Sequence, residues 1–531
     1  MTDFVSHYIL SLLIFFPLFA ALIIFLIPNG NNNCKLHRNI AMLAAVLEFI
    51  FSLHLVRYFI RSSSQFQFSQ FVPWLPKSTG INYVLGVDGL SLSLILLSTT
   101  FSMFAVMTTY TAIKSKIKGF LILFLMLESA LIGVFTSLDV VLFYIFWEAS
   151  LIPVYFMMGI WGGKQRIYAT LKFFIYGVAG SLLMLVALIY LYYTHGQGTG
   201  IYSSNILDLY HTAATLPFNI QCWLFLALTL SFGIKVPIFP FYSWIPDAYE
   251  QSPAIYTIMS GVILKLATYA LIRFSLCLFP AAASHYATFI MILATIGILY
   301  GAIIAWQQTN IRRIMAFSSL SHLGFIVLGI FAFNQFALQG ALYQMLNHAI
   351  TAGALFILFN FLDERRNTFE IGDFGGLAKV LPWFSFFFVI VCMGSVALPS
   401  TGSFIGEWLI LIGAFQSAPI IATVATLGVI LGAVYMLWIT YKVLFGPIKH
   451  NDLKNIQGMR GYEVFQLIVL SAFIFILGFA ATPVLDHTKA TLLMIEKTVL
   501  QKTPYQSQLM NTDHGFLVPI KSYLDFARGD K

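Results

Sequence analysis

Long apolar runs dominate this chain and decide what it can fold into. The first, ILSLLIFFPLFAALIIFLIP at 9–28, holds no charged residue. About 20 apolar residues in a helix cross the ~30 Å hydrocarbon core of a bilayer. A backbone in lipid must satisfy its own hydrogen bonds, so each run is expected to be helical. The prediction is an all-α polytopic membrane protein.

Composition excludes the soluble alternative. Only 29 Lys+Arg and 21 Asp+Glu occur in 531 residues, which is 9% charged, while 59% of the residues are hydrophobic. A soluble domain carries roughly 25% charged residues. The apolar surplus must therefore face lipid. Cys34, Cys222, Cys277 and Cys392 lie far apart in the sequence, which predicts no iron–sulfur or zinc ligand set in this chain.

About fourteen spans are predicted from apolar windows bounded by charge, proline or glycine. They lie at 9–28, 38–60, 88–112, 119–137, 139–161, 169–194, 220–249, 252–276, 286–307, 311–333, 336–362, 379–416, 418–446 and 462–482. Two windows are too long for one straight helix. The window 220–249 contains Pro237 and Pro240, and 379–416 contains Pro399. Each is predicted to break within the membrane because proline removes a backbone donor.

The basic residues predict the orientation of the chain. Connectors after the odd-numbered spans hold 16 of them, whereas the opposite connectors hold only Arg57, Arg61 and Lys77. The 16 are Lys35, Arg38, Lys114, Lys116, Lys118, Lys164, Arg166, Arg312, Arg313, Arg365, Arg366, Lys379, Lys442, Lys449, Lys454 and Arg460. Because basic connectors stay on the cytoplasmic side, both termini are expected on the external side.

The two broken windows also predict an internal repeat. Spans 4–8 and 9–13 contain five helices each, with the break in the fourth, and an odd number of helices per repeat forces the second copy to be inverted. The predicted units are three N-terminal helices at 1–117, repeats at 118–284 and 285–446, and a last helix with a polar tail at 447–531. The alternative is that two long helices simply kink at proline.

A few ionisable residues fall in the middle of spans, where an ionised group costs ~2.5–3.5 kcal/mol. Such groups usually pair with each other or line a hydrated path. Glu148, in LFYIFWEASLIP, has no basic residue within one helical turn, so its partner must come from another helix. Lys235 ends the first half of a broken span, where helix carbonyls favour its ammonium form and burial disfavours it. A Glu148–Lys235 pair that opens and closes is predicted to act as a proton gate.

Four further residues extend this chemistry. Lys265, His322 and His348 lie mid-way along their spans, and Glu407 follows the second break. Histidine can accept a proton on one ring nitrogen while donating from the other, which suits a relay. The separations also fit a repeat, because Glu148 to Lys235 is 87 residues and His322 to Glu407 is 85.

Structural roles remain open for each of these residues. An intramembrane histidine often makes only a helix-to-helix hydrogen bond, and Glu148 and Lys235 could form a purely structural ion pair. Glu128 is a weaker candidate: it could feed the path, couple neighbouring subunits or make a helix contact. For Glu48 the structural role is favoured, since its span lies outside both predicted repeats.

Six strings carry a resemblance to a known family. They are GVDGLSL (86–92), LFYIFWEASLIP (142–153), FGIKVPIFPFYSWIPDAY (232–249), AFSSLSHLGF (316–325), NHAITAGALF (347–356) and LPSTGSFIGEW (398–408). Over about residues 80–450 the sequence resembles the antiporter-like subunits of respiratory complex I. Tyr242 and Tyr249 stand where many members have histidine.

The resemblance implies a function and a setting. Glu148 and Lys235 would be the proton gate, Lys265, His322 and His348 the relay, and Glu407 the exit-side carboxylate. The chain would move protons without a cofactor of its own, while FMN, iron–sulfur clusters and quinone would belong to the rest of the complex. Its partners would be neighbouring antiporter-like and other membrane subunits and lipid, not nucleic acid, in a bacterial inner membrane. A subunit of a multisubunit sodium/proton antiporter and a structural spacer are the alternatives.

Overall fold

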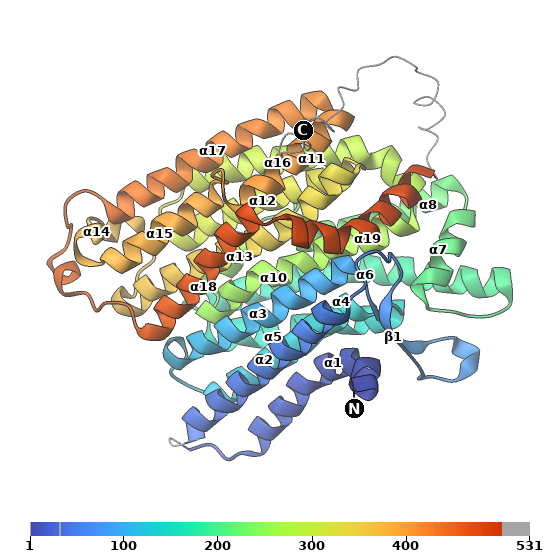
Figure 1. Ribbon diagram of the computed structural model, residues 1–531, viewed down its shortest axis with the longest axis horizontal. Helices are drawn as coiled ribbons and strands as arrows, with labels where there is room; N and C mark the ends of the chain where they lie inside the picture. Colours follow the sequence, from blue (N-terminus) through green and yellow to red (C-terminus); the bar gives the residue numbers. More distant parts are fainter. Residues whose placement is uncertain (1, 31–32, 502–531) are drawn as a thin grey trace, which may run out of the picture.

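The computed structural model describes residues 2–30 and 33–501 and is almost entirely helical (Figure 1). Up to the first break the helices are α1 (Thr2–Leu26), α2 (Asn33–Tyr58), α3 (Gly89–Ala112), α4 (Ile117–Thr136), α5 (Val140–Trp161), α6 (Arg166–Thr199), α7 (Ile206–Thr215) and α8 (Phe218–Lys235). Between the breaks they are α9 (Trp244–Gln251), α10 (Ala254–Ala270), α11 (Pro280–Gln307), α12 (Ile311–Phe331), α13 (Gln335–Arg366), α14 (Leu377–Val380) and α15 (Pro382–Ser395). The last four are α16 (Gly402–Ser417), α17 (Pro419–Leu444), α18 (Gly461–Phe479) and α19 (Thr482–Gln501).

The predicted membrane fold is confirmed. Within the described residues, 13 helices are long and apolar enough to cross a membrane. The predicted count of about fourteen differs by one because the twelfth window consists of two shorter helices, α15 and α16. A helix satisfies every backbone donor and acceptor except those in its end turns. Several N-termini are capped by a side chain that accepts a bond from a free N–H, as at Asp88, Asp139, Asn310 and Asn334.

Both predicted breaks are present. Helix α8 ends at Lys235, and an irregular segment of proline and aromatic residues leads into the short helix α9. Helix α15 ends at Ser395, and α16 begins at Gly402 after a segment containing Pro399. Lys235 therefore occupies the last position of a half-helix, as the sequence predicts. Glu407 lies in the second turn of the half-helix that follows the other break.

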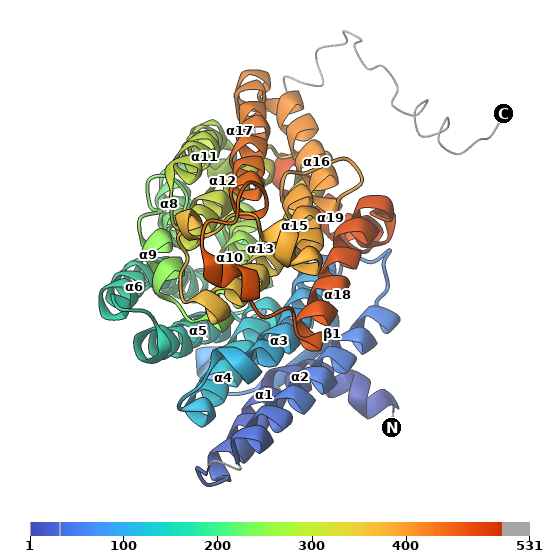
Figure 2. The same ribbon diagram turned by 90° about the vertical axis from the view of Figure 1, so that its left-hand side faces the viewer.

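The core of the bundle consists of α10, α12 and α13. Their most apolar stretches are completely buried by the surrounding helices, and Figure 2, which looks toward one end of the molecule, has α10 and α13 at its centre. Helix α13 contacts α10, α12 and α16, and α12 lies against α11. Polar side chains on these central helices are consequently shielded from lipid, and they can contact one another.

Several elements outside the spans were not predicted, among them α7, a β-hairpin and α19. Strands β1 (Gln67–Pro73) and β2 (Asn82–Val87) form an antiparallel hairpin, with Phe71 opposite Val84. Helix α19 follows the last span, lies across the bundle in Figure 1 and packs against α3 and α13. The polar tail predicted after the last span begins with this helix, which is not among the candidate membrane spans of the described residues. Residues beyond Gln501 lie outside the described part.

Asp139 fixes the hairpin to the bundle. Its carboxylate accepts hydrogen bonds from the backbone N–H of Val141 and Leu142 at the start of α5, at 2.9 and 3.1 Å, and from Asn82 N–H of β2 at 3.1 Å. The hydroxyl of Ser204 also donates to it. Burial raises the pKa of the Asp139 carboxyl, and these hydrogen bonds oppose that rise.

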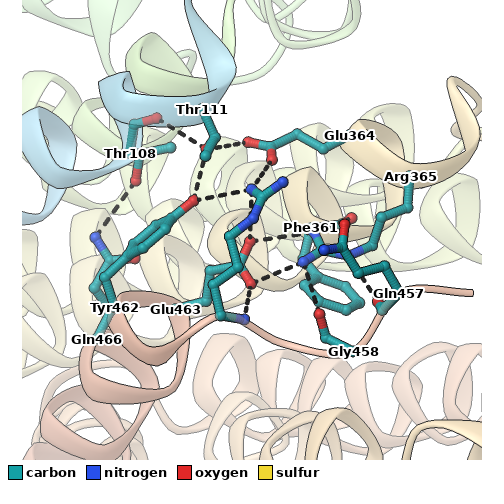
Figure 3. Close-up of polar contacts among 11 residues, drawn as sticks. Thr108, Thr111, Phe361, Glu364, Arg365, Gln457, Gly458, Tyr462, Glu463 and Gln466 are labelled. Carbon is teal, nitrogen blue, oxygen red and sulfur yellow. Dashed lines mark hydrogen bonds and ion pairs between the residues drawn. The ribbon is translucent and has the colours of Figure 1, made fainter.

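An ion-pair network joins α3, α13 and α18 at one end of the bundle (Figure 3). Arg365 contacts Glu463 at 2.9 Å, and Arg460 contacts Glu364 at 2.9 Å. Thr111 of α3 donates to Glu364 at 2.7 Å. The Arg365–Glu463 pair is buried and doubly hydrogen-bonded, the geometry in which an arginine–carboxylate pair is strongest.

A glycine of α18 packs directly against the second break. A Cβ added at Gly478 would lie 1.9 Å from the carbonyl oxygen of Ser400, a backbone atom that cannot move aside. We expect Gly478→Ala to lower the free energy of unfolding by about 1–3 kcal/mol through overpacking. Thermal unfolding of the detergent-solubilised protein measures this. Gly432→Ala is the control, because a Cβ there meets nothing within 4 Å; equal stability of the two variants would contradict the prediction.

Candidate functional site

Lys265 and His348 are in direct contact in the centre of the bundle. Lys265 Nζ lies 2.6 Å from His348 Nδ1, and the two side chains are 0% and 3% exposed. The backbones of α10 and α13 approach closely here, since a Cβ at Gly261 would lie 3.1 Å from the Cα of Ala349. At this distance the two nitrogens are hydrogen-bonded, and when Lys265 is protonated its ammonium group is the donor, which is the arrangement that proton transfer between them requires.

His322 continues this contact toward α16. Its ring centroid is 5.4 Å from that of His348, and its Nδ1 lies 3.1 Å from Glu407 Oε1. The other ring nitrogen, Nε2, is buried without a hydrogen-bond partner. Lys265, His348, His322 and Glu407 thus form one row of titratable groups across four helices, which we call the Lys265–Glu407 row.

Gln344 completes the end of the row and was not predicted from the sequence. Its Nε2 donates to Glu407 Oε1 at 3.0 Å. It lies four residues before His348, on the same face of α13. The sequence signal that could have identified it is a polar amide within an otherwise apolar span. Gly340 and Gly406 allow α13 and α16 to meet: a Cβ at Gly340 would lie 2.6 Å from the backbone N of Ile410, and one at Gly406 would lie 2.6 Å from Gln344 Oε1.

Lys235 has a different set of contacts from those of the row. Its Nζ lies 3.9 Å from the ring centroid of Trp147 and 3.3 Å from Ser150 Oγ. The lysine is 6% exposed. A cation over an indole face is stabilised by the ring's quadrupole. Trp147 and Ser150 were not predicted as site residues from the sequence, although both lie close to Glu148 in the string LFYIFWEASLIP.

Glu148 does not touch Lys235 in this structure. No ion pair joins the two among the described side chains, and one carboxylate oxygen of Glu148, Oε1, is buried without a partner. Both groups nevertheless belong to the same region, since Trp147 and Ser150, which hold Lys235, are Glu148's neighbours on α5. The geometry is therefore that of a Glu–Lys pair in which the carboxylate and the ammonium are apart.

The weaker candidates lie outside the row. Glu128 of α4 and Glu48 of α2 face each other, and within the described part neither makes a hydrogen bond or an ion pair with a side chain of the row. In that same part, no group of three or more His, Cys, Asp or Glu side chains could hold a metal ion.

Comparisons with known proteins identify the family of this chain. Residues 137–432, which contain every member of the row, match the family model described as NADH:quinone oxidoreductase/Mrp antiporter, TM. NADH-quinone oxidoreductase subunit M of Rickettsia prowazekii is 37% identical over 492 residues, covering 92% of this chain and 99% of that protein. Subunit M of Rhodobacter capsulatus is 39% identical over 490 residues, covering 90% of this chain and 94% of that protein.

A solved structure shows the same fold. A chain of respiratory complex I from Thermus thermophilus with bound NADH superposes with a TM-score of 0.81 at 27% identity, covering 92% of this chain and 99% of that one. Sequence and structure agree over nearly the full length of these relatives, and the chain belongs to the family of NADH:quinone oxidoreductase and Mrp antiporter membrane subunits.

Proposed function

We propose that this chain is the proton-translocating subunit M of a bacterial NADH:quinone oxidoreductase. The observation that carries the proposal is the Lys265–Glu407 row, in which four buried titratable groups on four helices follow one another through the centre of the bundle. Buried ionisable groups in a membrane protein are costly, so a connected set of them favours proton conduction. The near-complete alignment with relatives named subunit M supports the assignment.

The row suggests the order of proton transfers. Protonated Lys265 would donate to His348 Nδ1, the imidazoles would pass the proton on, and Glu407 would accept it and release it to the external side. Gln344 would hold Glu407 oriented toward His322 through its amide donor. Quinone reduction elsewhere in the complex would move the carboxylate of Glu148 relative to Lys235, and Lys235 would then pass its proton to Lys265. One charge crossing 100 mV requires ~2.3 kcal/mol of work.

The orientation of the subunit in the membrane, its internal repeats and the location of the cofactors are part of the same proposal. The basic connectors would lie on the cytoplasmic side and both termini on the external side of the inner membrane. The two sets of five spans, α4–α10 and α11–α17, would be inverted repeats, because each has its fourth span broken. FMN and iron–sulfur clusters would be bound by other subunits.

The row is tested by removing its first proton donor, Lys265. In the assembled complex, Lys265→Met should lower proton pumping in inverted vesicles roughly tenfold or more, because a positioned acid–base group is lost. Lys379→Met, at an exposed lysine, should pump normally. Both variants should retain normal subunit content in the complex. Unchanged pumping by an assembled Lys265→Met complex would reject the row as the proton path.

A multisubunit sodium/proton antiporter is the second candidate, since the matched family model covers both classes. Co-purification distinguishes the two: flavin and iron–sulfur subunits are expected with this chain if it belongs to the oxidoreductase. Sodium-dependent growth without NADH-linked activity would favour the antiporter. Normal pumping by variants at all six predicted residues would instead indicate a structural spacer.

A further inference from the structure

Two buried carboxyl groups outside the row face each other across a helix interface. Glu48 lies on α2 and Glu128 on α4, and both are 0% exposed. Their side chains are within hydrogen-bonding reach of one another. None of their four oxygens receives a hydrogen bond from a charged or amide donor, and no ion pair within residues 2–30 and 33–501 involves either group.

The surroundings are polar but uncharged. The hydroxyl of Ser102 on α3 is fully buried, faces Glu128 and has no hydrogen-bond partner. One turn along α2 from Glu48, the hydroxyl of Ser52 is hydrogen-bonded to that of Thr99 on α3 at 2.9 Å. Helices α2 and α3 therefore contribute small polar groups to this interface, and Ser102 points an unused hydroxyl at the carboxyl pair.

Electrostatics decides the protonation of such a pair. Two carboxylates in contact in a low-dielectric interior repel each other, and each also loses its hydration. A proton placed between them removes one charge, and the resulting O–H donates to the other carboxyl, so the two groups titrate as a unit. Without a proton, four acceptor oxygens would meet with no donor except Ser102.

We propose that Glu48 and Glu128 form a proton-binding site that holds at least one proton at neutral pH, separate from the Lys265–Glu407 row. The site does not depend on the function proposed above, since it rests on the burial and mutual contact of two side chains. Its ligand is a proton. A sodium ion would need several more oxygen ligands than these two carboxyls and one hydroxyl supply.

The site lies level with the predicted gate. Helices α4 and α5 are consecutive and antiparallel, joined by a short turn. Glu128 precedes the end of α4 at Thr136 by as many residues as Glu148 follows the start of α5 at Val140. At ~1.5 Å per residue, both carboxyls lie roughly 12 Å from that turn. A proton held by the pair would therefore lie at the depth at which Glu148 operates, on the adjacent helix.

Infrared spectroscopy of the purified complex in lipid at pH 7 tests the proposal, because a neutral carboxylic acid has a C=O band that a carboxylate lacks. We expect the difference between wild type and the isosteric double variant Glu48→Gln/Glu128→Gln to contain such a band, shifted in D2O. Glu370→Gln, at an exposed carboxylate, should give no such difference. Subtraction cancels bands from Glu148 and Glu407, which both proteins retain.

Each outcome is decisive. A double variant that assembles and shows no lost neutral-acid band overturns the proposal, as does a wild-type band that disappears on adding sodium chloride, which would indicate a cation held by two carboxylates. If the double variant fails to assemble, the single variants are used. Each single substitution should move the frequency of the remaining acid's band, and an unmoved band in both would equally reject a shared proton.

Discussion

Replacing Lys235 by methionine is expected to lower proton pumping by the assembled complex roughly tenfold or more. Lys235 is held by the Trp147 ring and Ser150 Oγ, both on the helix that carries Glu148. Methionine fills a similar volume beside the indole but carries neither charge nor transferable proton. Glu148→Gln is expected to have the same effect, because the amide cannot attract the ammonium as a carboxylate does. Pumping driven by NADH in inverted vesicles, normalised to subunit content, measures both.

Two controls make this result specific to the gate. Lys379→Met changes an exposed lysine and should leave pumping unchanged. Ser150→Ala removes only a 3.3 Å hydrogen bond to Lys235, so a partial loss is expected. If the Lys235→Met and Glu148→Gln complexes both assemble and pump at the wild-type rate, the gate assignment is wrong.

Removing Asp88 is expected to give the largest loss of stability. Its carboxylate pairs with Arg273 where both side chains are almost fully buried, at 2% and 1% exposure. It also caps α3 by accepting a hydrogen bond from Ser91 N–H at 3.0 Å. Asp88→Ala would leave a buried guanidinium without its counter-charge, at a cost of about 3–5 kcal/mol, and would remove a helix cap worth about 1 kcal/mol. Thermal unfolding of the complex, and the fraction of this subunit retained in it, report the loss.

A double variant separates the stability lost through an unpaired buried charge from the stability lost through the missing side-chain contact. In Asp88→Ala/Arg273→Met no buried charge remains, so much of the stability should return. Asp452→Ala is the control for a weak pair: Asp452 is 62% exposed in its contact with Arg366, and exposed pairs contribute about 0–1 kcal/mol. Equal stability of Asp88→Ala and Asp452→Ala would contradict the role assigned to the buried pair.

Much of the fold could be predicted from the sequence because lipid imposes simple rules. The length of the apolar runs predicted the spans, and the prolines within two of them predicted both breaks. Lys235 lies at the end of one half-helix and Glu407 shortly after the start of another. The hairpin and α19 were not predicted. Their sequences are short or mixed in polarity, and their structure depends on contacts such as those of Asp139 with Asn82 and of α19 with α3.

The sequence by itself determined which groups can carry charge inside the membrane, since a rare titratable residue in an apolar span is visible without coordinates. Only the tertiary structure decided which of them meet. Lys265 contacts His348, and His322 contacts Glu407. Lys235 instead lies against Trp147, and Glu48 faces Glu128. The physical reason is that the central helices are apolar on all sides, so their sequences do not indicate which face meets which neighbour. Close backbone approach at small residues such as Gly261, Gly340 and Gly406 sets those rotations.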